Sequence, residues 1–132
     1  MVGSADLLVR PKNHIECAII LKTCYICNIL LTISAGKTNL TGSATPLGGV
    51  FLSITQINSI DSIDIPNKTI TASPGIYLEE FRNYIINESK QKLIFPVDPT
   101  SRKEAMLGGA ISCNASGFTP GERGAMRYWI NG

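Results

Sequence analysis

The sequence predicts an α+β fold that begins with a small parallel β–α–β unit and continues into an antiparallel subdomain. Two observations lead to this prediction. A strand, a helix and a second strand follow one another before residue 36, within about 30 residues, as in parallel β–α–β units. Apolar and polar residues then alternate on both sides of Pro66 and Asn67, which is typical of a β-hairpin. With 132 residues, 44% of them hydrophobic, the chain suits one globular domain or one piece of a larger one.

The β–α–β unit takes up the start of the chain. Residues 6–11 predict a short strand that ends at a proline, and residues 12–28 predict a helix with Asn13 as its N-cap. Residues 29–35 predict the second strand. Its apolar run is continuous rather than alternating, so we expect this strand to be fully buried. The buried face of the helix is predicted to consist of Ile15, Ala18, Ile19, Leu21 and Ile26.

The following segments predict a second group of elements. Residues 49–54 form a third strand, and residues 57–75 form the hairpin, closed by a turn at Pro66 and Asn67. Residues 76–92 predict an amphipathic helix. Its inward side chains are expected to be Leu78, Phe81, Ile85 and Ile86.

The C-terminal part is less regular. Residues 93–97 predict another short strand. Residues 98–124 are rich in glycine, serine and other small residues, and this segment looks too irregular to pack by itself. Loops of this length are usually functional or disordered.

Charge and composition argue against several classes of function. Twelve basic residues nearly balance ten acidic ones, and no basic stretch or aromatic platform indicates nucleic-acid binding. The longest apolar region is interrupted by Lys22 and Asn28, whereas a transmembrane helix needs about 20 nearly uncharged residues. The N-terminus lacks the features of a secretion signal. We therefore expect a cytoplasmic protein, and the sequence leaves peripheral contact with a membrane open.

The four cysteines do not predict a metal site. Cys24 and Cys27 make a CxxC, but both lie with Cys17 inside the predicted helix. A zinc site would need a second pair of ligands, and Cys113 and the single histidine, His14, are what remains. These cysteines are better interpreted as small, buried apolar residues.

The loop that follows the second strand contains a Gly-Lys-Thr triplet, which is also the end of a nucleotide-binding P-loop. A P-loop needs an earlier glycine, separated from this one by four residues, and it opens directly into a helix. The position of the earlier glycine is Leu31 here. The residues after the triplet carry three glycines and Pro46, which a helix would not sustain. Both requirements fail, so the loop is not a P-loop.

The same loop has the composition of another kind of anion site. Small side chains let successive backbone N–H groups approach phosphate oxygens closely. The small residues are Ala35, Gly36, Gly42, Ser43 and Ala44, hydroxyl groups come from Thr38, Thr41 and Ser43, and Lys37 could add a positive charge. The alternative is a plain connection between strands, but the loop is longer than a connection needs. The composition therefore favours an anion cradle.

Several segments, in order along the chain, resemble one flavoprotein family. Residues 34–54, SAGKTNLTGSATPLGGVFLSI, are similar to the pyrophosphate loop and following strand of the vanillyl-alcohol oxidase / p-cresol methylhydroxylase family. Residues 95–117, FPVDPTSRKEAMLGGAISCNASG, resemble its second FAD-contact segment, and residues 121–132 resemble the stretch that closes this half of the FAD domain. The resemblance runs from Leu8 to Gly132 and is closest to the glycolate oxidase / D-lactate dehydrogenase branch.

The resemblance implies an FAD-binding type-2 (p-cresol methylhydroxylase-like) domain with FAD held between two subdomains. Residues 1–55 would form the β–α–β subdomain with the pyrophosphate loop, and residues 56–132 an incomplete second subdomain. The implied cofactor-binding residues are Ala35, Gly36, Lys37, Thr38, Asn39, Leu40, Ser43 and Ala44 at the diphosphate, Pro96 and Asp98 near the flavin or its ribityl chain, and Gly108, Gly109, Ser112, Cys113, Asn114 and Ser116 in a second wall.

The chain departs from the family in a few positions. Asn39, Ser43 and Ser116 stand where the family usually has glycine. Asparagine tolerates a left-handed backbone better than other non-glycine residues, so Asn39 is a mild departure. No loop histidine or cysteine matches the family's covalent attachment points, so we expect FAD to be bound non-covalently.

The implied function is that of the FAD-binding portion of an oxidoreductase acting on a 2-hydroxy acid or a similar alcohol. Family members continue well past Gly132 into a substrate domain, so we expect an N-terminal piece that is inactive without a C-terminal half or a partner subunit. A shortened polypeptide, a separately encoded subunit and a decayed gene are equally compatible with the residues. The alternative is a non-enzymatic remnant or interaction module that keeps the scaffold without flavin. The hairpin, residues 60–74, is expected to leave an exposed sheet edge prone to self-association.

Overall fold

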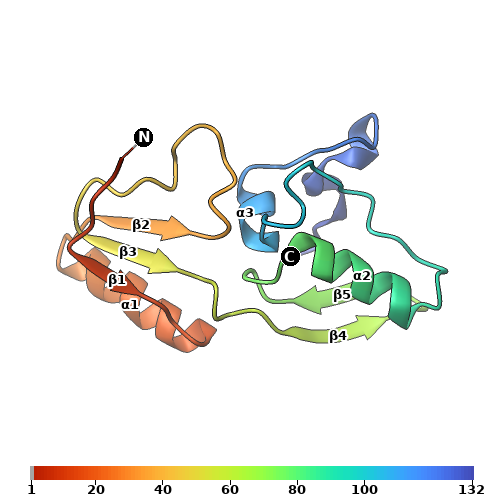
Figure 1. The fold of residues 1–132 in the computed structure, drawn as a ribbon. Helices are drawn as coiled ribbons and strands as arrows, with labels where there is room; N and C mark the ends of the chain where they lie inside the picture. The colour runs from red at the N-terminus through yellow and green to blue at the C-terminus, as the bar shows by residue number, and fades with distance from the viewer. Residues whose placement is uncertain (1) are drawn as a thin grey trace.

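The computed structural model describes residues 2–132 and confirms the predicted α+β fold (Figure 1). The first half contains β1 (Leu7–Val9), α1 (His14–Ile26), β2 (Leu31–Ser34) and β3 (Val50–Ser53). The second half contains β4 (Ile60–Asp64), β5 (Thr69–Ala72), α2 (Leu78–Glu88), α3 (Leu107–Ser112) and two short 3₁₀ helices, Glu122–Gly124 and Met126–Trp129. Figure 1 shows the two sheets at opposite ends of the molecule, with α3 between them.

The three strands of the first half form a parallel sheet with the order β1–β3–β2. The strands of the predicted β–α–β unit are parallel, as expected, but they do not pair with each other because β3 lies between them. Leu8 and Thr32 both pair with Phe51 in the centre of the sheet. All four residues of β3 are buried.

The expectation that the second strand is fully buried is wrong. β2 lies at an edge of the sheet, and Ile33 on this strand is 51% exposed. A continuous apolar run predicts burial on both faces, but here that environment belongs to the central strand β3. Strand order decides which of the two apolar strands is enclosed.

Helix α1 forms where it was predicted, but it turns a different face inward. The carboxamide oxygen of Asn13 accepts a hydrogen bond of 2.9 Å from the backbone N–H of Glu16, which confirms the N-cap. The residues predicted to be buried are exposed: Ile15, Ala18, Ile19, Leu21 and Ile26. Cys24 is the buried residue of the helix, at 5% exposure. Apolar residues lie on nearly every face of this helix, so their spacing does not predict which face is buried.

The hairpin and the second long helix agree with the sequence. β4 and β5 are antiparallel and are joined by a turn through Pro66 and Asn67. In α2 the side chains of Leu78, Phe81 and Ile85 are buried, and Ile86 is half-buried. Leu78, Phe81 and Ile85 form the main core together with residues of the C-terminal segment, and partly buried residues of β4 and β5 pack against it.

Two predictions for the C-terminal part are wrong. Residues 93–97 form no strand, because no neighbouring strand among residues 2–132 pairs with them and Pro96 lacks an N–H. Phe95 instead packs its ring against Phe81, with the centroids 5.1 Å apart.

The segment 98–124 is also more ordered than expected. It contains α3, whose residues Leu107 and Ala110 are buried in the core. The carbonyl oxygens of Arg102 and Ala105 accept hydrogen bonds of 2.9 and 2.8 Å from the first two N–H groups of α2. Since α2 has no side-chain N-cap, this segment supplies the acceptors that a helix start requires.

Candidate functional site

The loop between β2 and β3, residues 35–49, is anchored to the N-terminal segment. Figure 1 shows it as an arch from the end of β2 to the start of β3. The backbone N–H of Ser4 donates to the carbonyl oxygen of Pro46 at 3.1 Å, and Gly48 donates to Ser4 at 2.8 Å. The carboxylate of Asp6 accepts from the N–H of Gly49 at 2.8 Å. The returning half of the loop is therefore fixed in place.

In the part of the chain that the structure describes, the backbone N–H groups of residues 35–44 have no protein acceptor. Within residues 2–132, no N–H from Ala35 to Ala44 donates a hydrogen bond, and the first donor after them is Thr45, which bonds to Gly42 at 2.9 Å. The carboxamide of Asn39 holds this part of the loop by donating to the hydroxyls of Thr41 and Ser43. None of residues 35–44 is buried, so water can satisfy these N–H groups, and they remain available to an external anion.

The loop packs against the segment that leads into α3. A Cβ atom added to Gly36 would lie 2.1 Å from the carbonyl oxygen of Glu104. A Cβ atom on Gly109 would lie 3.2 Å from the Cβ of Ala35. The structure thus brings Ala35 and Gly36 together with Gly109, from the two segments that the sequence assigned to opposite walls of one site.

Gly108 connects the end of the parallel sheet with the end of the hairpin. A Cβ atom at this position would lie 2.6 Å from the side chain of Pro74 and 3.3 Å from that of Ile54. Ile54 follows β3, and Pro74 follows β5. The start of α3 is therefore packed between the two halves of the molecule.

The remaining residues of the predicted second wall lie at the other end of α3. Ser112, Cys113, Asn114 and Ser116 are all exposed. Asn114 has a positive φ of 47°, and its carboxamide oxygen accepts the N–H of Arg127 at 3.0 Å. Part of the hydrogen-bonding capacity of Asn114 is thus used within the protein.

Pro96 and Asp98 position a turn of the C-terminal segment. The carboxylate of Asp98 accepts from the N–H and the hydroxyl of Thr119, at 3.0 and 3.2 Å. The carbonyl oxygen of Pro96 accepts from the same hydroxyl at 2.8 Å. Both residues have a structural task here, whatever else they contact.

A groove of about 700 Å³ runs over the face of the parallel sheet beside the loop, and we call it the sheet groove. Its lining consists of Gly3, Ala5, Leu8, Arg10, Ala35, Lys37, Ala44, Thr45, Pro46, Phe51, Ser53 and Thr55. The ammonium group of Lys37 lies 4.6 Å from the centroid of the Phe51 ring. Sequence reasoning missed Arg10, and its place directly after β1, at the carboxyl edge of the sheet, was the available signal.

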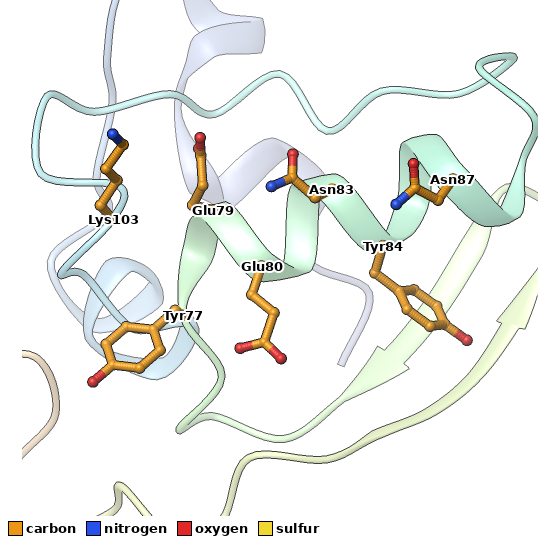
Figure 2. A pocket seen from close by; sticks show the side chains of 7 residues that line it. All are labelled: Tyr77, Glu79, Glu80, Asn83, Tyr84, Asn87 and Lys103. Carbon is orange, nitrogen blue, oxygen red and sulfur yellow. The ribbon is translucent and has the colours of Figure 1, made fainter.

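A second hollow of about 540 Å³ follows the exposed side of α2. Tyr77, Glu79, Glu80, Asn83, Tyr84, Asn87 and Lys103 line it. Figure 2 shows that these side chains extend to both sides of the helix and do not point toward a common centre. Glu79 is paired with Arg102 at 2.8 Å. This hollow is an open surface of α2, away from the loop.

The cysteines are all free thiols, and one prediction about them needs correction. Cys24 is buried, but Cys27 and Cys113 are exposed and so are not the buried apolar residues that the sequence suggested. Within residues 2–132 no three His, Cys, Asp or Glu side chains gather closely enough to hold a metal ion. Across the same residues, none of the helices combines the length and the apolar character that crossing a membrane demands.

Comparison with known proteins identifies the family. Residues 5–132 match the family described as FAD binding domain. The chain belongs to this FAD-binding domain family. The recognition made from the sequence is therefore confirmed, and FAD, the cofactor that it implied, is the cofactor of this domain family.

Curated relatives of this FAD-binding domain are 2-hydroxy acid enzymes by name. The chain is 31% identical over 126 residues to D-lactate dehydrogenase of Anaerostipes hadrus, which covers 95% of the chain and 26% of that protein. It is 32% identical over 128 residues to glycolate oxidase subunit GlcD of Bacillus subtilis (strain 168), a match that covers 96% of the chain and 27% of that protein. It is 28% identical over 131 residues to mitochondrial D-2-hydroxyglutarate dehydrogenase of Danio rerio, a match that covers 98% of the chain and 24% of that protein. The chain thus spans about a quarter of the length of these relatives.

Solved structures agree with the fold of the family. An alkyldihydroxyacetonephosphate synthase superimposes with a TM-score of 0.80 over 92% of the chain and 23% of that structure, at 21% sequence identity. A chitooligosaccharide oxidase superimposes with a TM-score of 0.65 over 83% of the chain and 23% of its own, at 14% identity. At these identities the likeness concerns the fold alone.

Proposed function

We propose that this chain is the FAD-binding part of a flavin-dependent oxidoreductase that oxidises a 2-hydroxy acid or a similar alcohol. Membership of the FAD-binding domain family and the names of the curated relatives support the class of reaction. The structural observation that carries the proposal is the run of backbone N–H groups from Ala35 to Ala44 that lack an acceptor within residues 2–132. Such a run fits a diphosphate, which presents several oxygen anions in a row.

We assign the diphosphate of the cofactor to the loop and the sheet groove beside it, and the rest of the cofactor to the side of the loop that leads toward the segment around α3. The N–H groups of residues 35–40, with Ser43 and Ala44, would hold the diphosphate. Gly108 and Gly109 are proposed to belong to the second wall, where their small size lets α3 pack closely against Pro74, Ile54 and Ala35. The remaining proposed contacts are those of Pro96, Asp98, Ser112, Cys113, Asn114 and Ser116.

Bound flavin would supply the redox chemistry by accepting a hydride equivalent from the substrate. The contribution of this chain is to bind and orient the cofactor. We propose that residues 1–55 and 56–132 form two subdomains around FAD, bound non-covalently, and that a C-terminal half or a partner subunit supplies the substrate domain. On this proposal the chain alone binds FAD but does not turn over substrate.

A charge placed in the loop tests the proposal. Ser43 is exposed, so S43D should fold, while its carboxylate would repel the diphosphate. We expect the purified wild-type chain to retain a yellow chromophore after addition of FAD and gel filtration, and we expect S43D to bind FAD at least about tenfold more weakly. Flavin fluorescence during titration measures the affinity.

The matched control is S62D, the same exchange at an exposed position in β4. It should bind FAD like the wild type. A colourless wild-type protein whose melting temperature does not rise with FAD would contradict the proposal and favour a scaffold that no longer holds flavin.

A further inference from the structure

We propose that Arg10 and Lys37, here called the cation pair, neutralise the diphosphate of FAD. The diphosphate would lie in the sheet groove, at the carboxyl ends of the strands. This inference rests on the proposed function and deepens it, because it adds Arg10 to the binding residues and gives Lys37 a defined task. Four features of the structure support it.

The first feature is the charge of the sheet groove. Its charged lining residues are Arg10 and Lys37, and no Asp or Glu lines it. Its hydroxyl groups are those of Thr45, Ser53 and Thr55, and its floor includes the apolar side chains of Leu8 and Phe51. A concave site with cations and hydroxyl groups but no carboxylate attracts an anion.

The second feature is the position of the cation pair on the sheet. Arg10 directly follows β1, and Lys37 lies three residues beyond the end of β2. Ser53 ends β3 between them, since β3 is the central strand. In open parallel sheets, ligands bind beyond the carboxyl ends of the strands. All three strands therefore place a polar side chain where a ligand is expected.

The third feature is the backbone of Lys37. Its φ is 56°, in the left-handed region that glycine adopts without strain and that other residues avoid. Residues in such conformations persist where the surrounding structure holds them, and they are frequent at ligand sites. The ammonium group lies over the ring of Phe51, so the side chain is held against the floor of the groove.

The fourth feature is that neither positive charge is paired with a carboxylate among residues 2–132. The ion pair found among residues 2–132 joins Arg102 to Glu79, and neither Arg10 nor Lys37 takes part in one. The diphosphate of FAD carries two negative charges, which two cations balance. A guanidinium group also presents paired N–H donors that match phosphate oxygens.

The experiment compares two variants of the cation pair with matched controls. R10Q and K37G each remove one charge from the groove. R82Q, on α2, is the arginine control. K68G is the lysine control, because Lys68 in the hairpin turn has the same φ of 56° and K68G makes the same exchange. Dissociation constants for FAD and for riboflavin, which has no phosphate, are measured at several salt concentrations.

We expect R10Q and K37G each to weaken FAD binding by about tenfold and to reduce its dependence on salt, since screening acts on charge interactions. Riboflavin affinity should stay that of the wild type. R82Q and K68G should bind FAD like the wild type. Melting temperatures without FAD identify any variant that has lost its fold.

The outcomes separate this inference from the proposed function. A wild-type chain that takes up no FAD defeats the proposed function. A wild-type chain that binds FAD, with R10Q or K37G retaining its affinity and salt dependence, overturns the cation pair and leaves the proposed function intact. Equal losses in K37G and K68G, or equal losses for FAD and riboflavin, also overturn it.

Discussion

Among single residues, Gly36 is the one at which the loop and the α3 segment meet most closely. A Cβ atom there would lie 2.1 Å from the carbonyl oxygen of Glu104 and 3.2 Å from the Cα of Ala105. Both are backbone atoms, so the neighbour cannot move aside as a flexible side chain would. The side-chain size at position 36 therefore controls how the two segments fit together.

We expect G36A to lower the free energy of unfolding by about 1–3 kcal/mol, the usual cost of forcing an extra methyl group into packed structure. Urea unfolding measures the change. Gly132 is the control, because nothing lies within 4 Å of a Cβ at that position and its φ is not in the left-handed range. G132A should change stability by less than about 0.5 kcal/mol. A G36A protein as stable as G132A would show that the loop and the α3 segment are not in tight contact.

The sequence suggests an anion site in the loop more readily than it suggests the residues that lie near the loop in the fold. The small side chains from Ala35 to Ala44 suggest an anion cradle from the sequence alone, because they all lie in one segment. Arg10 could not be found in this way, because its place in the same groove as Lys37 depends on the strand order β1–β3–β2. The interactions of Asp98 with Thr119 were also hidden, because the two residues are far apart in the sequence.

At the scale of elements, the hairpin turn contains a carboxylate that stabilises it in a pH-dependent way. The pKa of Asp64 lies below its ordinary value of 3.8, first because the backbone N–H of Asn67 donates to it and second because the side-chain amide of Asn67 does so too. A carboxyl group whose pKa is lower in the folded state stabilises the fold above its unfolded pKa. This stabilisation is lost as the pH falls through the folded pKa.

We expect the wild type to be more stable than D64A at pH 6, and the difference to shrink as the pH falls below about 4. Thermal unfolding of both proteins at a series of pH values measures it. E88A, which removes an exposed carboxylate of α2, corrects for general charge effects. A difference between wild type and D64A that stays constant from pH 6 to pH 2 would contradict the role of Asp64.

The two long helices differ in how much their apolar side chains contribute to stability. Ile85 in α2 is 6% exposed and lies in the core, whereas Ile19 in α1 is 59% exposed. We expect I85A to lower the free energy of unfolding by about 2–5 kcal/mol and I19A to change it by less than about 0.5 kcal/mol. Chemical unfolding of both variants gives the comparison. Equal losses would mean that the exposed side of α1 is covered in solution.

These elements also show which predictions a sequence allows. The cap at Asn13 and the spacing in α2 are local signals, and both helices form where these signals place them. The inward face of α1 and the state of residues 93–97 depend on neighbours, and both predictions failed. An apolar helix gives no directional signal, and a short apolar run becomes a strand only if another strand lies beside it.

At the scale of the whole molecule, the two-stranded sheet has free edges. β4 and β5 pair with each other, and neither pairs with a third strand within residues 2–132. Unpaired strand edges are templates for pairing with another chain. We expect the chain to self-associate as its concentration rises, and sedimentation velocity measures this. A sharp single monomer boundary up to millimolar concentration would count against it.

The central place of β3 has a consequence for how the protein is made. Every residue of β1, and every residue of β2, finds its partner in β3. A nascent polypeptide that has not yet reached Val50 therefore holds two apolar strands that cannot complete a ladder. In the folded sheet β3 lies between them, and its pairing with both strands closes the arch that leads into it. Completion of the sheet and closure of the loop between β2 and β3 therefore depend on the same strand.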